Sequence, residues 1–278
     1  MTYQELTALL KAANIESPEW DAALLLEHFC NILPSRIDPN DKTDYLSEAL
    51  WEAAKRRAAH YPLQYIIGEW SFYRQTYEVS PACLIPRSDT EVLVEEAVRR
   101  LPQNARFADL CTGSGCIAIS TLCERPDTVA YAVDKFEDTL AIAQRNAKRN
   151  GIGDRLTLRQ KDVLTDPIFD TDEIYDAILS NPPYIRTQVV GELAPELSAE
   201  PVVALDGGED GLVFYRALLK KCRSHLKKDG FFLFEIGFDQ AEDITRLAKE
   251  AGYSVCKIIK DLGGNDRVAF ISEQGAPT

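Results

Sequence analysis

Hydrophobic residues recur at helical spacing in three segments near the start of the chain: residues 2–14, residues 17–29 and a stretch from about residue 44 to residue 60. Ser17 and Pro18 stand in the order typical of an N-cap and a first helical position. Pro62 follows the third segment, where it closes a helix. The pattern predicts a small bundle of helices over residues 1–75.

The pattern becomes aromatic and alternating between residues 68 and 86, which predicts a β-hairpin. Residues 76–88 then form the end of a linker between two domains. Four aromatic side chains lie in the hairpin: Trp70, Phe72, Tyr73 and Tyr77. Such side chains either pack between domains or contact a partner protein, and the pattern leaves both open.

Helical and strand-like segments alternate from residue 89 onward. The strand-like runs are residues 106–108, 128–134, 156–160, 175–180 and 268–271. This alternation predicts an α/β fold with a doubly wound, mainly parallel sheet over residues 89–278. A length of 278 residues agrees with two domains of unequal size.

Composition narrows the range of partners and cofactors. A net charge of −13 argues against a broad phosphate-binding surface, and so against duplex DNA binding, and it favours a basic protein partner. The seven cysteines form no Cys-x-x-Cys pair and the three histidines lie far apart, so we expect no metal site. The sequence shows neither an apolar stretch of about 18 residues nor a signal peptide, so we expect a cytoplasmic protein without a membrane segment.

A glycine-containing loop follows the strand at residues 106–108 and opens an apolar helix. Its residues are Cys111, Thr112, Gly113, Ser114 and Gly115. Glycine permits a tight turn and a close approach of a ligand to the backbone. The spacing suits a dinucleotide as well as S-adenosylmethionine, so the loop alone does not separate NAD from a methyl donor.

Acidic residues follow the next two strands. Asp134 ends the strand at residues 128–134, where a carboxylate can accept hydrogen bonds from a ribose, although it can also cap the helix beginning near Phe136. Asp162 follows the strand at residues 156–160 and can accept from an adenine amine, while the adjacent backbone N–H of Val163 can meet a ring nitrogen. A simple turn is the alternative role for Asp162.

The sequence Asn-Pro-Pro-Tyr at residues 181–184, called the tetrapeptide below, directly follows the strand at residues 175–180. Ligands of open α/β sheets bind past the carboxyl ends of the strands. Asn181 Oδ1 and the Pro182 carbonyl can both accept hydrogen bonds from one planar NH2 group and aim its lone pair at an electrophile. Pro182 and Pro183 stiffen the loop, and Tyr184 offers a flat face to an amide or a base. A rigid structural turn is the alternative.

Two further segments accompany these loops. Ser88 and Glu91 have the spacing of a capping box, while Arg87 or Glu91 can equally act at the edge of a catalytic site. Residues 192–210 form a stretch with Pro and Gly that is too long for an ordinary connection. We interpret it as a substrate-facing flap with Glu200 near its middle, and a passive surface loop is the alternative.

These motifs resemble those of the release-factor glutamine N5-methyltransferases. The resemblance rests on Asp-Leu-Cys-Thr-Gly-Ser-Gly at residues 109–115, Asn-Pro-Pro-Tyr-Ile at residues 181–185, and segments at residues 62–68, 84–91 and 200–212. It implies a class I S-adenosylmethionine-dependent methyltransferase fold, with a Rossmann-like sheet and an N-terminal helical domain. It also implies that the acceptor is the glutamine in the Gly-Gly-Gln motif of peptide chain release factors.

The resemblance assigns roles to particular residues as well. For the cofactor it implicates residues 111–115, Asp134, Asp162, Val163 and Asn181. For the glutamine it implicates Asn181, Pro182, Pro183 and Tyr184, with Asn181, Pro182 and Tyr184 in catalysis. Family members often carry tryptophan where this chain has Val163, which leaves the packing partner of the adenine open. The alternatives are a ribosomal protein glutamine methyltransferase and an N6-adenine DNA methyltransferase, the second disfavoured by the acidic charge balance.

Overall fold

The computed structural model describes residues 1–40, 42–45, 47–170 and 172–273. The described chain divides into two compact units. The first contains residues 1–69 together with residues 193–200, and the second contains the rest. Residue 46 of the predicted third helix, and residues 171 and 274–278 of the predicted methyltransferase domain, lie outside the described residues.

The first unit consists of helices α1 (Tyr3–Ala12), α2 (Pro18–Cys30), α3 (Glu48–Ala58) and α4 (Leu63–Ile67). Its core includes fully buried leucines from the first three helices: Leu6, Leu10, Leu25, Leu26 and Leu50. Pro18 begins α2 after Ser17, as predicted, but the Ser17 side chain makes no capping hydrogen bond. The third helix begins at Glu48 rather than near residue 44, because the Ser47 hydroxyl accepts the Leu50 N–H and caps the helix there.

Strands β1 (Glu69–Phe72) and β2 (Gln75–Glu78) form the predicted hairpin. Phe72 and Tyr77 are buried in the core of the second unit, and the Tyr77 hydroxyl lies 2.6 Å from Ser120 Oγ. These two aromatic side chains are therefore packing residues. Beyond Glu78 the chain leaves the hairpin, and the Ala82 carbonyl accepts a hydrogen bond of 2.6 Å from the Thr139 hydroxyl.

The second unit is built on a seven-stranded sheet. In chain order its strands are β3 (Arg106–Leu110), β4 (Val129–Asp134), β5 (Leu156–Gln160), β6 (Tyr175–Ser180), β7 (Leu226–Glu235), β8 (Val255–Lys260) and β9 (Asp266–Ser272). Their order across the sheet is β5-β4-β3-β6-β7-β9-β8. The strands β3, β4, β5, β6 and β7 run parallel to one another. Strand β9 lies between β7 and β8 and is antiparallel to both. The prediction of a mainly parallel sheet is confirmed.

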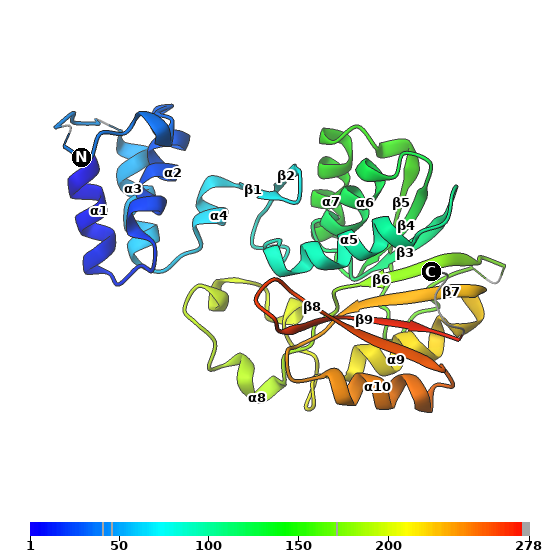
Figure 1. The fold of residues 1–278 in the computed structure, drawn as a ribbon. Helices are drawn as coiled ribbons and strands as arrows, with labels where there is room; N and C mark the ends of the chain where they lie inside the picture. Colours follow the sequence, from blue (N-terminus) through cyan, green and yellow to red (C-terminus); the bar gives the residue numbers. More distant parts are fainter. Residues whose placement is uncertain (41, 46, 171, 274–278) are drawn as a thin grey trace. The chain divides into compact units, whose positions relative to one another are not determined.

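Helices cover both faces of this sheet. Helices α5 (Glu91–Arg100), α6 (Cys116–Glu124) and α7 (Glu137–Arg149) lie on one side, and α9 (Val213–Lys221) and α10 (Ala241–Glu250) lie on the other (Figure 1). Successive residues of a strand point to opposite faces of the sheet. In β7, Phe231 and Leu233 therefore pack on the side of α5, α6 and α7, whereas Phe232 and Phe234 pack on the side of α9 and α10. A short helix, α8 (Thr187–Val190), follows the tetrapeptide.

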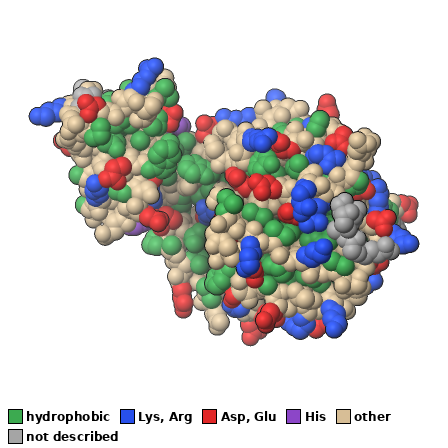
Figure 2. Space-filling model, viewed as in Figure 1, with side chains coloured by type: hydrophobic (Ala, Val, Ile, Leu, Met, Phe, Trp, Pro, Cys, Tyr) green, Lys and Arg blue, Asp and Glu red, His purple; other side chains and the backbone are tan. Residues whose placement is uncertain are grey.

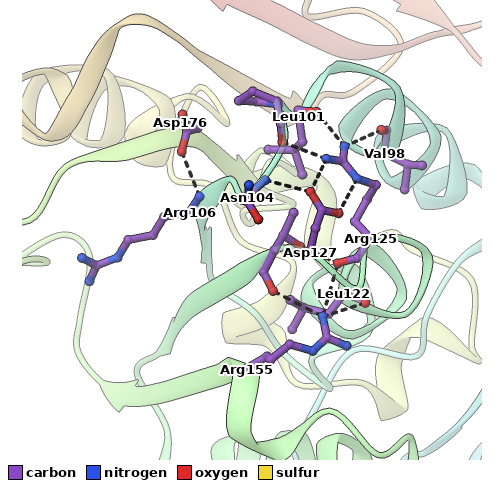
Figure 3. A network of polar contacts seen from close by, with 11 residues as sticks. Val98, Leu101, Asn104, Arg106, Leu122, Arg125, Asp127, Arg155 and Asp176 are labelled. Atoms are coloured by element: carbon purple, nitrogen blue, oxygen red, sulfur yellow. Dashed lines mark hydrogen bonds and ion pairs between the residues drawn. The ribbon is translucent and has the colours of Figure 1, made fainter.

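A polar network joins the loops at the amino ends of the central strands (Figure 3). Arg125 donates to the carbonyls of Val98 and Leu101 at 3.1 and 2.6 Å and pairs with Asp127 at 2.9 Å. Asp176, at the start of β6, accepts the Arg106 N–H at 2.8 Å. These contacts lie at the amino ends of the central strands, opposite the carboxyl ends of β3, β4, β5 and β6.

Candidate functional site

A cavity of about 370 Å³ lies at the carboxyl edge of the sheet, entirely within the second unit. The chain leaves β3 toward β4 on one side and reaches β6 on the other, so the cavity stands at a point where the strand order reverses. Its volume is in the range of small-molecule sites. Eight residues predicted for the site line it: Cys111, Thr112, Ser114, Asp134, Asp162, Val163, Asn181 and Pro183. Four do not: Gly113, Gly115, Pro182 and Tyr184.

The glycine loop is held in a conformation that few side chains allow. Gly113 and Gly115 have φ values of +55° and +82°, and a Cβ on Gly115 would stand 2.9 Å from the Ile119 side chain. Behind the loop, the buried Asp109 accepts hydrogen bonds from the Thr112 hydroxyl at 2.6 Å and the Ala118 N–H at 3.2 Å. Burial raises the pKa of Asp109 to about 7. This carboxyl therefore fixes both ends of the loop from inside the fold.

Asp134 reaches back to the glycine loop. Its Oδ2 accepts the Gly113 N–H at 3.0 Å and its Oδ1 accepts the Phe136 N–H at 3.2 Å. The N-cap residue of α7 is Phe136, so the capping alternative for Asp134 is wrong: the aspartate forms a turn two residues earlier. Each carboxylate oxygen keeps a second lone pair for a ligand hydroxyl.

Asp162 lies in a turn after β5. Its Oδ1 accepts the Leu164 N–H at 2.9 Å, and its Oδ2 lies 3.0 Å from Lys135 Nζ. Burial acts to raise the pKa of Asp162, but the contacts with the Leu164 N–H and with Lys135 outweigh it and keep the pKa below its usual value. The adjacent Val163 is buried and forms part of the cavity wall. Asp162 is therefore a turn residue, which was the alternative role, and it also lines the cavity, where a ligand can reach it.

The tetrapeptide lies between two anchors. Asn181 Nδ2 donates to Thr90 Oγ1 at 3.2 Å, and the Tyr184 hydroxyl donates to Glu235 Oε1 at 3.2 Å. Gln240 Nε2 donates to the Tyr184 carbonyl at 3.0 Å. No described residue donates a hydrogen bond to the Pro182 carbonyl. Asn181 lines the cavity, and the carbonyl of Pro182, its neighbour in the chain, is an acceptor that the rest of the described protein leaves available.

Residues 201–211, called the returning segment below, pack against the backbone of the tetrapeptide. The Ile185 N–H donates to the Leu205 carbonyl at 2.9 Å, and the Gly207 N–H donates to the Ile185 carbonyl at 2.8 Å. A Cβ on Gly207 would lie 2.7 Å from the Pro183 carbonyl oxygen, and one on Gly211 would lie 2.4 Å from the Tyr184 carbonyl oxygen. Only glycine permits this approach, which the sequence alone did not reveal.

The long segment at residues 192–210 has two parts. Residues 193–200, which include the buried Glu200, group with the first unit. From Pro201 onward the segment belongs to the second unit, and Val202 and Val203 line the cavity while remaining 55% and 54% exposed. The later part is therefore an apolar cavity wall.

Residues 87–91, near the domain boundary, were predicted either to cap a helix or to lie at the edge of a catalytic site. The predicted capping box of Ser88 and Glu91 is absent: neither Arg87, the N-cap of the 3-10 turn at Ser88–Thr90, nor Thr90, the N-cap of α5, makes a side-chain cap. The Glu91 carboxylate instead accepts the Tyr73 N–H from the hairpin at 2.7 Å. Arg87 lines the cavity.

Burial keeps two of the thiols that line the cavity neutral. Cys83, Cys111 and Cys116 line it, and burial raises the pKa values of the Cys111 and Cys116 thiols. A neutral thiol is a weak nucleophile, so the cavity is suited to positioning ligands rather than to covalent catalysis by these groups.

Among the described residues, His, Cys, Asp and Glu side chains form no group of three that could hold a metal ion. The described helices include none that is long and apolar enough to cross a membrane.

Comparison with solved structures identifies the fold of the second unit. A methyltransferase from Pyrococcus furiosus superimposes with a TM-score of 0.53 and 20% identity, covering 70% of this chain and 86% of that chain. A ribosomal protein L11 methylase from Lactobacillus delbrueckii subsp. bulgaricus gives a TM-score of 0.51 and 21% identity, covering 71% and 84%. The second unit therefore has the class I S-adenosylmethionine-dependent methyltransferase fold, as predicted.

Sequence comparison is more specific. Residues 2–68 match the PrmC N-terminal domain, and residues 88–218 match the methyltransferase small domain. A release factor glutamine methyltransferase of Moorella thermoacetica is 39% identical over 93% of this chain and 92% of that protein. One of Geobacter sulfurreducens is 42% identical over 77% of this chain and 74% of that protein. The chain belongs to the release factor glutamine methyltransferase family, which confirms the resemblance seen in its motifs, and a methyl donor of the S-adenosylmethionine type goes with this family.

Proposed function

We propose that this protein transfers a methyl group from S-adenosylmethionine to the side-chain amide nitrogen (N5) of the glutamine in the Gly-Gly-Gln motif of peptide chain release factors. The observation that carries the proposal is the orientation of Asn181. Its Nδ2 is bound to Thr90 Oγ1, which leaves Oδ1 as an acceptor beside a cavity lined by the glycine loop. The Pro182 carbonyl is the second acceptor for the same NH2 group.

The residues present fit the donor. The glycine loop allows close approach of a ligand, Asp134 has lone pairs for ribose hydroxyls, and Val163 with Val202 and Val203 provides apolar surface for a purine. Val163 is smaller than the tryptophan common in the family, and the two exposed valines of the returning segment supply additional apolar wall on the same cavity. We assign the adenine to this part of the cavity.

Bound S-adenosylmethionine would supply a methyl group on a positively charged sulfur, which departs as a neutral thioether. An amide nitrogen is a poor nucleophile because its lone pair is delocalised into the carbonyl. Hydrogen bonds from its two N–H groups to Asn181 Oδ1 and the Pro182 carbonyl hold the nitrogen in place and favour a pyramidal geometry. The nitrogen forms the new bond to carbon and releases one proton to water, so no covalent enzyme intermediate is required.

Two related acceptors are the alternatives. A glutamine of a ribosomal protein would fit the same acceptors and would differ only in its contacts with the enzyme surface. An adenine in duplex DNA would first have to be flipped out at a cost of a few kcal/mol. On the face shown in Figure 2, Lys and Arg side chains lie among Asp and Glu side chains, and the net charge is −13, which disfavours DNA.

A parallel labelling assay tests the choice of acceptor. The enzyme is incubated with labelled S-adenosylmethionine and, separately, with a release factor, a ribosomal protein and duplex DNA. We expect label on the release factor, with only a moderate loss at raised salt because a protein encounter lacks the counterion release of DNA binding. Label on DNA adenine and on no protein would overturn the proposal.

A further inference from the structure

The chemistry of the tetrapeptide depends on which end of the Asn181 amide faces the ligand. The oxygen and the NH2 group of an amide have nearly the same shape, but only the oxygen can accept a hydrogen bond from a substrate NH2. In the structure, Asn181 Nδ2 points to Thr90 Oγ1 at 3.2 Å. A threonine hydroxyl can accept or donate, so Thr90 by itself does not fix this orientation.

A second buried side chain stands next to Thr90. Glu235 is the last residue of β7 and is 2% exposed, and Thr90 is also 2% exposed. Glu235 Oε1 accepts the Tyr184 hydroxyl, whereas Oε2 makes no hydrogen bond of normal geometry with any residue that the structure describes. The Thr90 hydroxyl opposes the rise in the pKa of this carboxyl. An ionised carboxylate only accepts hydrogen bonds, so it can take the Thr90 proton.

We propose that Glu235 is a positioning residue that sets the direction of the Asn181 amide through Thr90. The carboxylate accepts the Thr90 hydroxyl proton, the Thr90 oxygen therefore accepts from Asn181 Nδ2, and Asn181 Oδ1 is left for the substrate amide. On its other oxygen the same carboxylate holds the Tyr184 hydroxyl, so one buried group orders the two polar side chains of the tetrapeptide. The catalytic consequence rests on the proposed function, whereas the orientation of Asn181 does not.

The charge of Glu235 is set by its surroundings. Burial raises the pKa of this carboxyl to about 7, with Thr90, Arg267 of β9 and the Tyr184 hydroxyl opposing the rise and Asp89 adding to it. Tyr215 of α9 faces the same residue through a hydrogen bond of 2.7 Å to the Glu235 carbonyl, and Cys116 of α6 also feels its charge.

Protonation reverses the hydrogen-bond chain. A protonated carboxyl can donate to Thr90 Oγ1, which frees the Thr90 hydroxyl to donate to Asn181 and allows the amide to turn its NH2 group toward the ligand. The active orientation is therefore favoured above a pH of about 7 and lost as the pH falls through that value. Activity should show an acidic limb with a midpoint there.

Four single variants and one double variant, Glu235→Gln combined with Thr90→Val, test this relay. Glu235→Gln keeps the shape but can donate, Thr90→Val keeps the shape without a hydroxyl, and Thr90→Ser keeps the hydroxyl. Glu173→Gln is the matched control, because that carboxyl pairs with Arg106 and lies outside the cavity. For each, kcat, KM for the release factor and Kd for S-adenosylmethionine are measured from about pH 6 to about pH 9.

The relay predicts a specific set of results. Glu235→Gln and Thr90→Val lower kcat by about tenfold to a hundredfold, change the Kd for S-adenosylmethionine less than about threefold, and lose the acidic limb. The double variant is no slower than Thr90→Val, because both changes cut the same chain. Thr90→Ser recovers most of the lost kcat, and Glu173→Gln retains the limb. Wild-type kcat and an intact acidic limb in Glu235→Gln would overturn the proposal.

A readout that needs no substrate separates this inference from the proposed function. The side-chain amide of Asn181 gives an NMR signal, which should shift with pH at the Glu235 midpoint in the unmodified protein and not in Thr90→Val. A signal that titrates identically in both would overturn the relay even if the release factor is methylated. Failure of the unmodified enzyme to methylate any release factor would instead contradict the proposed function alone. If Glu235→Gln does not fold, the Thr90→Val comparison decides the case.

Discussion

The Gly113 N–H donates a hydrogen bond of 3.0 Å to Asp134 Oδ2, and this contact joins the glycine loop after β3 to the carboxyl end of β4. β3 and β4 are neighbouring parallel strands, and Asp134, the last residue of β4, lines the cavity. Burial raises the pKa of Asp134, while the N–H groups of Gly113 and Phe136 oppose that rise. The carboxylate thus supports the glycine loop from the end of β4.

Asp134→Ala should weaken S-adenosylmethionine binding. The change removes the ribose acceptors and one support of the glycine loop, and losing such a polar contact costs about 1–3 kcal/mol. Calorimetric titration measures the loss. Asp138→Ala, an exposed position in the first turn of α7, is the control and should bind normally. Equal affinity of the two variants would mean that Asp134 has only a structural role.

Asn181→Ala should depress turnover far more than it weakens release-factor docking. The protein partner is held over a wide surface, whereas Asn181 orients one nitrogen during the transfer, so we expect a loss in kcat of about a hundredfold. Steady-state kinetics give kcat, and a direct binding assay gives the affinity. Asn150→Ala, at the C-cap of α7 and outside the cavity, is the control. Wild-type turnover at saturating substrate would make the tetrapeptide a structural turn.

Gly207→Ala should damage the site without touching any ligand. The new Cβ would stand 2.7 Å from the Pro183 carbonyl oxygen, and neither backbone segment can move freely, so we expect a destabilisation of about 1–3 kcal/mol with a displaced tetrapeptide. Thermal unfolding and kcat are measured together. Gly153→Ala is the control, since a Cβ there meets nothing within 4 Å and its φ is not positive. A fully stable and active Gly207→Ala would show that the close approach is unimportant.

Arg57→Ala should destabilise the helical unit. Arg57 Nε donates to Asp21 Oδ2 at 2.6 Å, and both residues are 7% exposed. Removing the arginine leaves a buried carboxylate without its cation, which typically costs about 3–5 kcal/mol. Urea unfolding is followed by the fluorescence of Trp20 and Trp51 in a Trp70→Phe background, because Trp70 belongs to the second unit. Lys55→Ala is the control, because its pair with Glu52 is exposed and contributes less than about 1 kcal/mol.

Local patterns predicted much of the fold. The run at residues 175–180 was predicted to be a strand because its centre is apolar, and it forms β6 with those limits. Pro18 marks the start of α2 because proline fits the first helical position. The start of α3 was misplaced because the apolar pattern does not show that Ser47 is the capping residue. Boundaries set by one side-chain hydrogen bond escape periodicity.

The candidate site divides in the same way. The loops after β3, β4, β5 and β6 were found because each follows a strand, and parallel strands bring their carboxyl ends together. Thr90, Glu235 and Gln240 were missed as partners of the tetrapeptide, because they lie 91, 51 and 56 residues from their contacts in sequence. The capping-box interpretation of Glu91 failed for the same reason, since the N–H that its carboxylate accepts belongs to Tyr73 of the hairpin. Such contacts depend on the tertiary fold.

The position of the transferred methyl group tests the central claim most directly. A release factor is incubated with the enzyme and S-adenosylmethionine, digested, and sequenced by mass spectrometry, beside a factor whose Gly-Gly-Gln glutamine is replaced by alanine. We predict one added methyl group on that glutamine side chain and none on the alanine factor. A methyl group on any other residue, or undiminished transfer to the alanine factor, would contradict the account.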